Sequence, residues 1–334
     1  MTTQPVSPEI PPRLGKLRSL WRMNPVTLKE LRGRMRGARA FVVMTVYLGL
    51  LAGFSLTLYV LYIATFDASI QSGQSGAFGR TLFFGILAIE LFLITFIVPS
   101  FTAGAITGER ERQTYDLLRT TLIKPRALVL GKLISALAYV FLLLLAAIPL
   151  QSLAFLFGGV GFEELALSFV VLLVTAVLIG TVGLFFSASQ RRTLSASIAT
   201  YGFGLFITLG LPLMLLIFFA IVGPFVIGLT GANLSLPLRA VLTYVVGALI
   251  CTNPLATGIV SQALLSDQGQ IGFFTQTYSA SGVMITLPLV SPWIVFSILY
   301  LILSAILLRI TIRRVERIDT NDDVLKYNLN KKER

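Results

Sequence analysis

The chain has 334 residues, of which 55% are hydrophobic and only 13% are charged, and its formal net charge is +12. A soluble protein carries about 25% charged residues, and a folded chain of this length could not bury so much apolar side-chain area. The absence of histidine excludes an imidazole base or ligand, and the single cysteine, Cys251, excludes an intrachain disulfide. Together with a mean hydropathy of +0.85, this composition predicts an integral membrane protein.

The polar N-terminal segment precedes the first apolar stretch. We expect residues 1–23 to form a disordered cytoplasmic tail, because its first twelve residues include four prolines. Asn24-Pro25 is typical of a helix start, and 24–39 predicts an amphipathic helix in the headgroup plane of the membrane. It is either a simple anchor or a lever that moves with a cytoplasmic partner. Its apolar stripe and its basic faces consist of Leu28, Leu31, Met35 and Ala38, and of Lys29, Arg32, Arg34, Arg36 and Arg39.

Six apolar stretches within 40–312 are long enough to cross a bilayer, which takes about 20 mostly apolar residues. They lie near 40–65, 81–105, 128–157, 165–187, 198–229 and 292–312. Lys and Arg concentrate on the cytoplasmic side of membrane proteins, and this topology leaves only Arg80 and Arg239, of 27 such residues, on the outer side. The sequence therefore predicts an all-α polytopic protein with six transmembrane helices in the cell membrane, plasma or inner, and with both termini cytoplasmic.

The outer segment 230–291 contains a further apolar stretch, 240–265, which Asn253-Pro254 interrupts. The part before this dipeptide would form roughly 20 Å of helix, less than the bilayer core of about 30 Å. We therefore expect two short outer-leaflet helices that pack on the spans, either re-entrant or lying on the surface. A long mobile outer loop is the alternative. Residues 313–334 are expected to form a cytoplasmic tail.

The connection between the second and third spans, 106–127, is strongly charged and contains the segment GERERQTYDLLRTTLIKPR. We expect Glu109 and Glu111 to extend the second span into the cytoplasm and Thr114–Thr120 to form about two helical turns. Pro125 can end this element and open the next helix. A short amphipathic helix held between two spans suits docking into a groove of another protein, and a loop with solvated charges is the alternative.

This connection resembles the cytoplasmic loop of ABC-2 type transporter permeases. In that family a Glu-x-Glu pair precedes a Thr-x-x-x-Leu-like turn, a Pro and then a Gly-Lys pair at the third span. The matching residues are Glu109, Glu111, Thr114, Leu117, Leu118, Pro125, Gly131 and Lys132, and Gln113 stands where the family usually has glycine. Asn24-Pro25 and Lys29-Glu30-Leu31-Arg32 are similar to the family's amphipathic N-terminal helix, so the resemblance covers about 24–314.

The resemblance implies a permease that pairs with a second permease subunit, identical or different, and with two ABC ATPase subunits, and that mostly exports its substrate. It also implies that the loop is a coupling helix, through which the ATPase acts on Glu109, Glu111, Thr114, Tyr115, Asp116, Leu117, Leu118 and Leu122. The chain itself should bind no cofactor, with ATP and Mg²⁺ on the partner. Its own sequence lacks a P-loop, because both of its Gly-Lys pairs, Gly15-Lys16 and Gly131-Lys132, are followed by leucine where the motif requires Ser or Thr. We expect no enzymatic activity in this chain.

One acid, Glu90, stands inside a predicted span, about 14 Å from its outer start at helical rise. Such a residue usually faces the bundle interior or a water-filled path. We predict that Glu90 lines the substrate route or the dimer seam. The alternative is a structural acid, protonated or hydrogen-bonded to Ser, Thr or Tyr of a neighbouring helix.

Two other classes of function remain open. An ion-coupled secondary transporter usually shows internal repeats and several charged residues at mid-membrane. A non-transporting membrane assembly subunit would use its basic surface to bind anionic lipid headgroups alone. Anionic headgroups are expected partners in each case. Nucleic-acid binding is not expected, because the cations follow the inner membrane edge instead of forming a separate domain.

Overall fold

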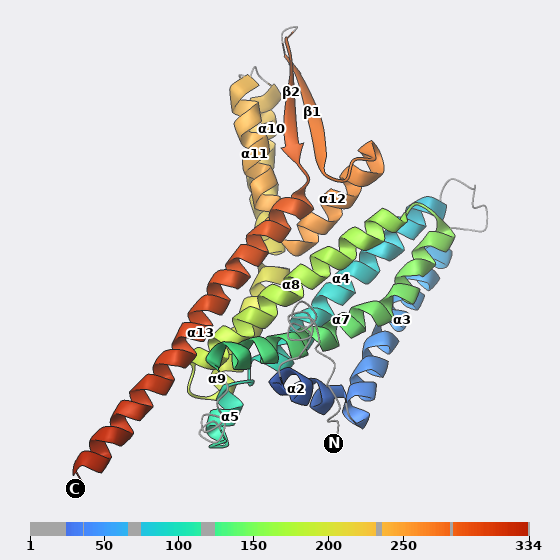
Figure 1. Ribbon diagram of the computed structural model, residues 1–334. Coiled ribbons are helices and arrows are strands. Elements are labelled where there is room, and N and C mark those ends of the chain that lie inside the picture. The colour runs from blue at the N-terminus through green and yellow to red at the C-terminus, as the bar shows by residue number, and fades with distance from the viewer. Residues whose placement is uncertain are drawn as a thin grey trace, which may run out of the picture.

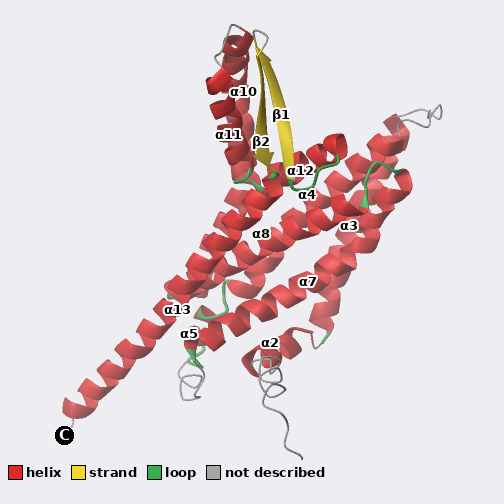
Figure 2. Ribbon diagram, turned by 45° about the horizontal axis from the view of Figure 1, so that its top comes forward, coloured by secondary structure: helices red, strands yellow, loops and turns green. Residues whose placement is uncertain are grey.

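The computed structural model describes residues 25–35, 37–65, 75–114, 124–231, 236–280 and 283–332. This part of the chain is helical except for one β-hairpin (Figures 1 and 2). Six of its helices are long and apolar enough to cross a membrane. The prediction of a helical, multi-pass membrane protein is therefore confirmed, while the hairpin shows that the expected all-α class is too narrow.

The elements follow in the order expected from the apolar stretches. They are α2 (Pro25–Met35), α3 (Ala38–Thr65), α4 (Ser75–Thr102), α5 (Thr107–Glu111), α7 (Pro125–Phe157), α8 (Phe162–Ser189), α9 (Thr193–Leu205), the π-helix η1 (Phe206–Gly210), α10 (Leu211–Gly231), α11 (Leu236–Ile250), α12 (Pro254–Gln268), β1 (Phe273–Ala280), β2 (Val283–Val290) and α13 (Pro292–Lys332). Pro125 opens α7 as predicted.

The core lies around α8, the most buried of the six long helices. One side of α8 packs against α4 and α7, through side chains such as Leu91, Val140 and Leu172. Its other side packs against η1 and α13, where Ile207 and Phe296 are buried. The apolar side chains on the outer faces of α3, α10 and α13 remain exposed, as expected of helices that face lipid or another apolar partner.

Small residues allow close contacts between the spans. A Cβ atom on Gly183 of α8 would lie 2.1 Å from Thr102 Oγ1 of α4, and one on Gly79 of α4 would lie 2.1 Å from the Gly158 carbonyl oxygen after α7. Both distances are far below van der Waals contact, so these helices can approach only where a side chain is missing. The α4–α8 and α4–α7 contacts thus depend on glycine at both ends of the bundle.

The fifth span is longer than a bilayer requires. α9, η1 and α10 run without interruption from Thr193 to Gly231, which corresponds to roughly 58 Å at helical rise, about twice the apolar core of a bilayer. Figures 1 and 2 show α10, α11 and the hairpin projecting beyond the bundle, at the end away from α2 and α5.

The two short helices predicted for the outer segment are α11 and α12, and the turn between them is buried against the spans. Asn253 is fully buried, accepts the backbone N–H of Ala256 at 3.0 Å and donates to the Ile207 carbonyl oxygen of η1 at 3.1 Å. The Tyr300 hydroxyl of α13 donates to the Thr252 carbonyl oxygen at 2.8 Å. The turn thus lies between the fifth and sixth spans.

Strands β1 and β2 were not predicted. They pair antiparallel in a register that joins Phe273 to Val290 and Ala280 to Val283. Their sequences, FFTQTYSA and VMITLPLV, are rich in aromatic and β-branched residues, which favour strands. The outer segment therefore holds a hairpin in addition to its two helices.

The last helix is also longer than expected. α13 continues through the predicted tail as far as Lys332. Near the end of the span, the Arg314 guanidinium donates to Ser189 Oγ at 2.5 Å and stands 4.9 Å from the centre of the Phe185 ring. These contacts fix the end of the sixth span to the end of α8.

Candidate functional site

The loop between the second and third spans begins at a break in the helix. α4 ends at Thr102, and α5 begins at Thr107 after a turn over 103–106. The backbone N–H groups of Ile106 and Thr107 donate to Ser187 Oγ of α8, at 2.9 and 3.1 Å. The second span runs as far as Glu111, as expected, but a turn divides it into α4 and α5. At this turn α8 supplies an acceptor for the donors that a new helix start leaves without partners, which permits the break.

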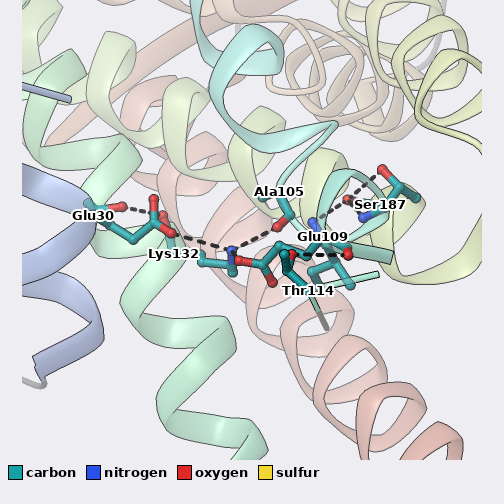
Figure 3. Close-up of polar contacts among 9 residues, drawn as sticks. Glu30, Ala105, Glu109, Thr114, Lys132 and Ser187 are labelled. Carbon is teal, nitrogen blue, oxygen red and sulfur yellow. Dashed lines mark hydrogen bonds and ion pairs between the residues drawn. The ribbon is translucent and has the colours of Figure 1, made fainter. Parts of the chain in front are cut away.

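Lys132, in the first turns of α7, is the centre of the polar contacts in Figure 3. Its Nζ atom lies 2.6 Å from Glu109 Oε1 of α5 and 3.4 Å from Glu30 Oε1 of α2, and it donates to the Ala105 carbonyl oxygen at 2.8 Å. An ammonium group has three donors. All three are directed to separate elements: the N-terminal helix, the break after α4, and α5.

Burial makes these contacts strong. The Lys132 side chain is only 3% exposed, whereas the side chains of Glu109 and Glu30 are 22% and 27% exposed. A buried cation is stable only when it is paired and hydrogen-bonded, and charge-assisted hydrogen bonds are stronger than neutral ones. Lys132 therefore holds α2, α5 and α7 together at one point.

Glu111 connects α5 to the fifth span. Its two carboxylate oxygens accept the backbone N–H of Thr193 at 2.7 Å and the Thr193 hydroxyl at 2.6 Å. Thr193 is the first residue of α9, so the carboxylate also lies at the positive end of that helix dipole. The hydrogen bonds from the Thr193 side chain and backbone hold the pKa of the exposed Glu111 carboxyl below its ordinary value. The glutamate thus caps α9 as an anion.

The turn after α5 has a backbone conformation that favours glycine. Gln113 has φ 57°, in the left-handed region. Its N–H donates to the Arg110 carbonyl oxygen, and the next N–H, of Thr114, donates to the Glu109 carbonyl oxygen, both at 3.0 Å. This is the position at which the resembling permeases usually have glycine, so the chain forms a glycine-type turn with glutamine.

The structure brings together the predicted coupling residues that it describes. Glu109, Glu111 and Thr114 all lie on α5 or directly after it, and the two glutamates bind different spans. The remaining predicted coupling residues lie outside the described part of the chain: Tyr115, Asp116, Leu117, Leu118 and Leu122. The sequence missed Ser187 and Thr193, and it gave Lys132 and Glu30 no specific role. The Gly-Lys pair and the Lys-Glu-Leu-Arg motif were the available signals for the last two.

The N-terminal helix differs partly from the predicted interfacial helix. α2 packs on α7 with the small polar Thr27 buried and with Glu30 directed to Lys132. Arg32 is exposed, Leu31 is half-buried, and Met35 is 39% exposed. The side chain of Leu28 and the whole of Arg36 lie outside what the structure describes. The packed face of α2 is therefore partly polar.

Glu90 lies far from this loop, on α4, and is fully buried. The Gln151 side chain of α7 donates to its Oε2 atom at 2.5 Å. The partner is thus an amide of the third span, whereas the sequence interpretation named Ser, Thr or Tyr.

The arrangement of the loop suits mechanical transmission between helices. Among the described residues, no group of three or more His, Cys, Asp or Glu side chains could hold a metal ion. The charged groups of the loop bind the ends of helices instead, so a displacement of α5 would be felt by α2, α7, α8 and α9. No protein-family model matches the chain, and no curated protein matches it.

Proposed function

We propose that this chain is the membrane-spanning permease subunit of an ATP-driven transporter of the ABC-2 type, acting as an exporter, with ATP hydrolysis on a separate subunit. The observation that carries the proposal is the contact of Lys132 with Glu109 and Glu30. The same residues belong to the motifs by which the chain resembles ABC-2 permeases, and they occupy the place where such a permease would receive force.

A coupling loop must be stiff where it meets the spans. On the side of the second span, Ser187 fixes the start of α5 to α8. On the other side, Lys132 fixes α5 to α7, and Glu111 fixes it to α9. A loop with solvated charges would absorb a push without moving the helices. These contacts instead support transmission from the loop to four different helices.

The proposal includes an orientation. Figure 1 places α2, α5 and the C-terminal part of α13 at one end of the molecule, and the sequence ranges that contain these elements, 1–39, 106–127 and 309–334, hold 22 of the 27 Lys and Arg residues. Positive residues favour the cytoplasmic side. We therefore place this end, with both termini, in the cytoplasm of a cell (plasma or inner) membrane, where its cations would meet anionic lipid headgroups.

The exposed apolar faces of α3, α10 and α13 suit lipid and a second permease subunit. Two such chains and two ATPase subunits would complete the transporter. In an ion-coupled transporter or an assembly subunit, the described contacts at the loop would serve only to stabilise the fold.

The test is co-purification with a P-loop ATPase, which is sought first in the reading frames adjacent to the gene. The tagged chain is co-expressed with that ATPase, extracted in mild detergent and assayed for vanadate-sensitive ATP hydrolysis. The wild-type chain should retain the ATPase, and the variant with Leu117→Asp and Leu118→Asp should lose it while still inserting into the membrane.

The matched control replaces two exposed apolar residues at the opposite end, Ile271 and Phe273, by Asp. This variant should retain the ATPase as the wild type does. Retention by the Leu117→Asp/Leu118→Asp protein would contradict docking through the loop. A wild-type chain that never retains the ATPase, and that is fully active without it, would contradict the proposed function as a whole.

A further inference from the structure

The pair formed by Glu90 and Gln151 contains two buried oxygens with no donor. Glu90 is 0% exposed and Gln151 is 3% exposed. One hydrogen bond joins them, from Gln151 Nε2 to Glu90 Oε2. Within the described part of the chain, neither Glu90 Oε1 nor Gln151 Oε1 has a hydrogen-bond partner. Both atoms are acceptors, and both belong to side chains that are already in contact.

If Glu90 is ionised, Glu90 Oε1 and Gln151 Oε1 both remain without a hydrogen-bond donor. A carboxylate can only accept hydrogen bonds, and so can an amide oxygen. A buried acceptor without a donor is unfavourable. A single proton on Glu90 Oε1 removes both deficits, because the acid then donates to Gln151 Oε1 while the amide continues to donate to Glu90 Oε2. The terminal torsions of both side chains are soft, so the two groups can face each other.

The charges around Glu90 also favour the neutral form. Its own helix has Arg80 ten residues away, about 15 Å at helical rise, and that guanidinium donates to the Gly159 carbonyl oxygen. On α7, Lys132 is about 28 Å along the helix from Gln151 and is bound to Glu109. An ionised carboxylate at Glu90 would therefore be buried without a cation, which is costly.

The other elements packed on α4 supply no cation at this depth. Their charged residues lie at the helix ends. Glu90 acts electrostatically on the Tyr47 hydroxyl of α3, which carries no positive charge and is buried without a hydrogen-bond partner among the described residues. The charged residues at the ends are Arg39 on α3, Arg126 on α7, Glu163 and Glu164 on α8, and Asp267 on α12.

We propose that Glu90 is a proton-binding site in the membrane interior: the carboxylate takes up one proton, and the resulting Oε1–H donates to Gln151 Oε1, so that a reciprocal acid–amide pair joins α4 to α7. The site binds a proton and no metal ion. It is independent of the proposed transport function, since it concerns only the state of this pair in the folded chain.

Infrared spectroscopy of the purified protein in lipid tests the proton directly. At neutral pH, the wild-type protein should show the C=O stretching band of a protonated carboxylic acid, which shifts down slowly in D₂O. Glu90→Gln should remove this band, and Glu163→Gln, which changes an exposed carboxyl at the end of α8, should leave it in place. Identical spectra for wild type and Glu90→Gln would overturn the proposal.

The role of Gln151 as the acceptor is tested by measuring the frequency of the acid C=O band in variants. Gln151→Leu removes the acceptor of the acid proton, so the band should shift to higher frequency and the melting temperature should fall by several degrees. Tyr47→Phe should change neither. A shift in Tyr47→Phe, with none in Gln151→Leu, would overturn the assignment of Gln151 as the acceptor.

An exchange of the two residues keeps the test decisive if Gln151→Leu fails to fold. The double variant with Glu90→Gln and Gln151→Glu preserves one acid, one amide and one proton. It should show both the acid band and the wild-type melting temperature. The single variant Glu90→Gln forms an amide–amide pair, so it should keep the wild-type melting temperature but show no acid band. An exchanged pair without an acid band would overturn the proposal.

Discussion

Lys132 Nζ and Glu109 Oε1 lie 2.6 Å apart, although 23 residues separate them in the chain. The contact closes the loop between the second and third spans at its base, directly beside the break between α4 and α5. Because the same ammonium also reaches Glu30 and the Ala105 carbonyl oxygen, the position of α5 depends on α2 and on the first turns of α7.

Replacing Lys132 by Met should destabilise this end of the bundle. The substitution keeps the length of the side chain but removes the cation that contacts Glu109 and Glu30. Loss of one partner from a buried ion pair costs about 3–5 kcal/mol, and we expect the lower end of this range because both glutamates are partly exposed. Thermal unfolding in detergent measures the loss.

Lys124→Met is the control, since Lys124 is an exposed lysine of the same loop, and its melting temperature should equal that of the wild type. The double variant with Lys132→Met and Glu109→Gln should regain part of the lost stability, because the Glu109 carboxylate that has lost its cation is replaced by a neutral amide. Equal melting temperatures for Lys132→Met and Lys124→Met would show that the contact does not stabilise the fold.

Replacing Glu111 by Ala should open the N-terminus of α9. The carboxylate satisfies the first N–H of that helix, so its loss should speed hydrogen exchange at the start of α9. Arg112→Ala, at the neighbouring exposed position, should leave exchange there unchanged. Unchanged protection in Glu111→Ala would contradict the capping role.

The same cap should depend on pH. The hydrogen bonds from Thr193 lower the pKa of Glu111 in the folded chain relative to its ordinary value of 4.5. Their stabilising contribution is therefore fully present above that value and is lost as the pH falls through the lowered folded pKa. After correction for the intrinsic exchange rate, protection of α9 should decline in acid in the wild type but not in Glu111→Ala.

The spans could be predicted because they depend on local composition. Runs of about 20 apolar residues determine the long helices, Pro125 marks the start of α7, and Asn253-Pro254 marks the start of α12. The hairpin β1–β2 was not predicted, because each strand has eight residues and is too short to stand out as an apolar run of helical length. The usable signal was the content of aromatic and β-branched residues in the two strands.

The contacts at the candidate site could be predicted only in part. Glu109 and Glu111 were identified by their motif, but their partners are far away in the chain: Thr193 is 82 residues from Glu111, and Ser187 is 81 residues from Ile106. No local pattern pairs residues over such distances. The break between α4 and α5 has the same origin, because Ser187 on another helix accepts the backbone N–H groups that the break leaves without partners.

Replacing Gln113 by Gly should stabilise the turn after α5. A non-glycine residue in the left-handed region costs about 1–2 kcal/mol of stability. Glycine removes this cost, but its greater conformational freedom in the unfolded chain offsets part of the gain. With φ 57° at Gln113, we expect a net gain of about 1 kcal/mol in the free energy of unfolding.

The control is Arg112→Gly, because Arg112 has φ −83° and gains nothing from glycine. This variant should be less stable than the wild type, so the two substitutions should shift the unfolding midpoint in opposite directions. A destabilised Gln113→Gly protein would mean that contacts of the glutamine side chain outweigh its backbone strain.

Replacing Asn253 by Ala should loosen the turn between α11 and α12. The substitution removes a helix cap, worth about 1 kcal/mol, and leaves the buried Ile207 carbonyl oxygen of η1 without its donor, which costs about 1–3 kcal/mol more. The adjacent Cys251 is buried and is the single cysteine of the chain. Its rate of reaction with N-ethylmaleimide therefore reports opening of the turn and should rise in Asn253→Ala.

Asn253→Ser separates the two roles of the side chain. Serine can still cap α12 but is too short to reach the fifth span, so a labelling rate between those of the wild type and Asn253→Ala is expected. If the serine variant reacts as slowly as the wild type, the cap alone holds the turn closed. If Asn253→Ser and Asn253→Ala both react as slowly as the wild type, the hydrogen bond to η1 does not control access to Cys251. The contact of the turn with Tyr300 of α13 is then sufficient to keep Cys251 buried. We expect the intermediate rate, because the amide is the group that joins the turn to the π-helix.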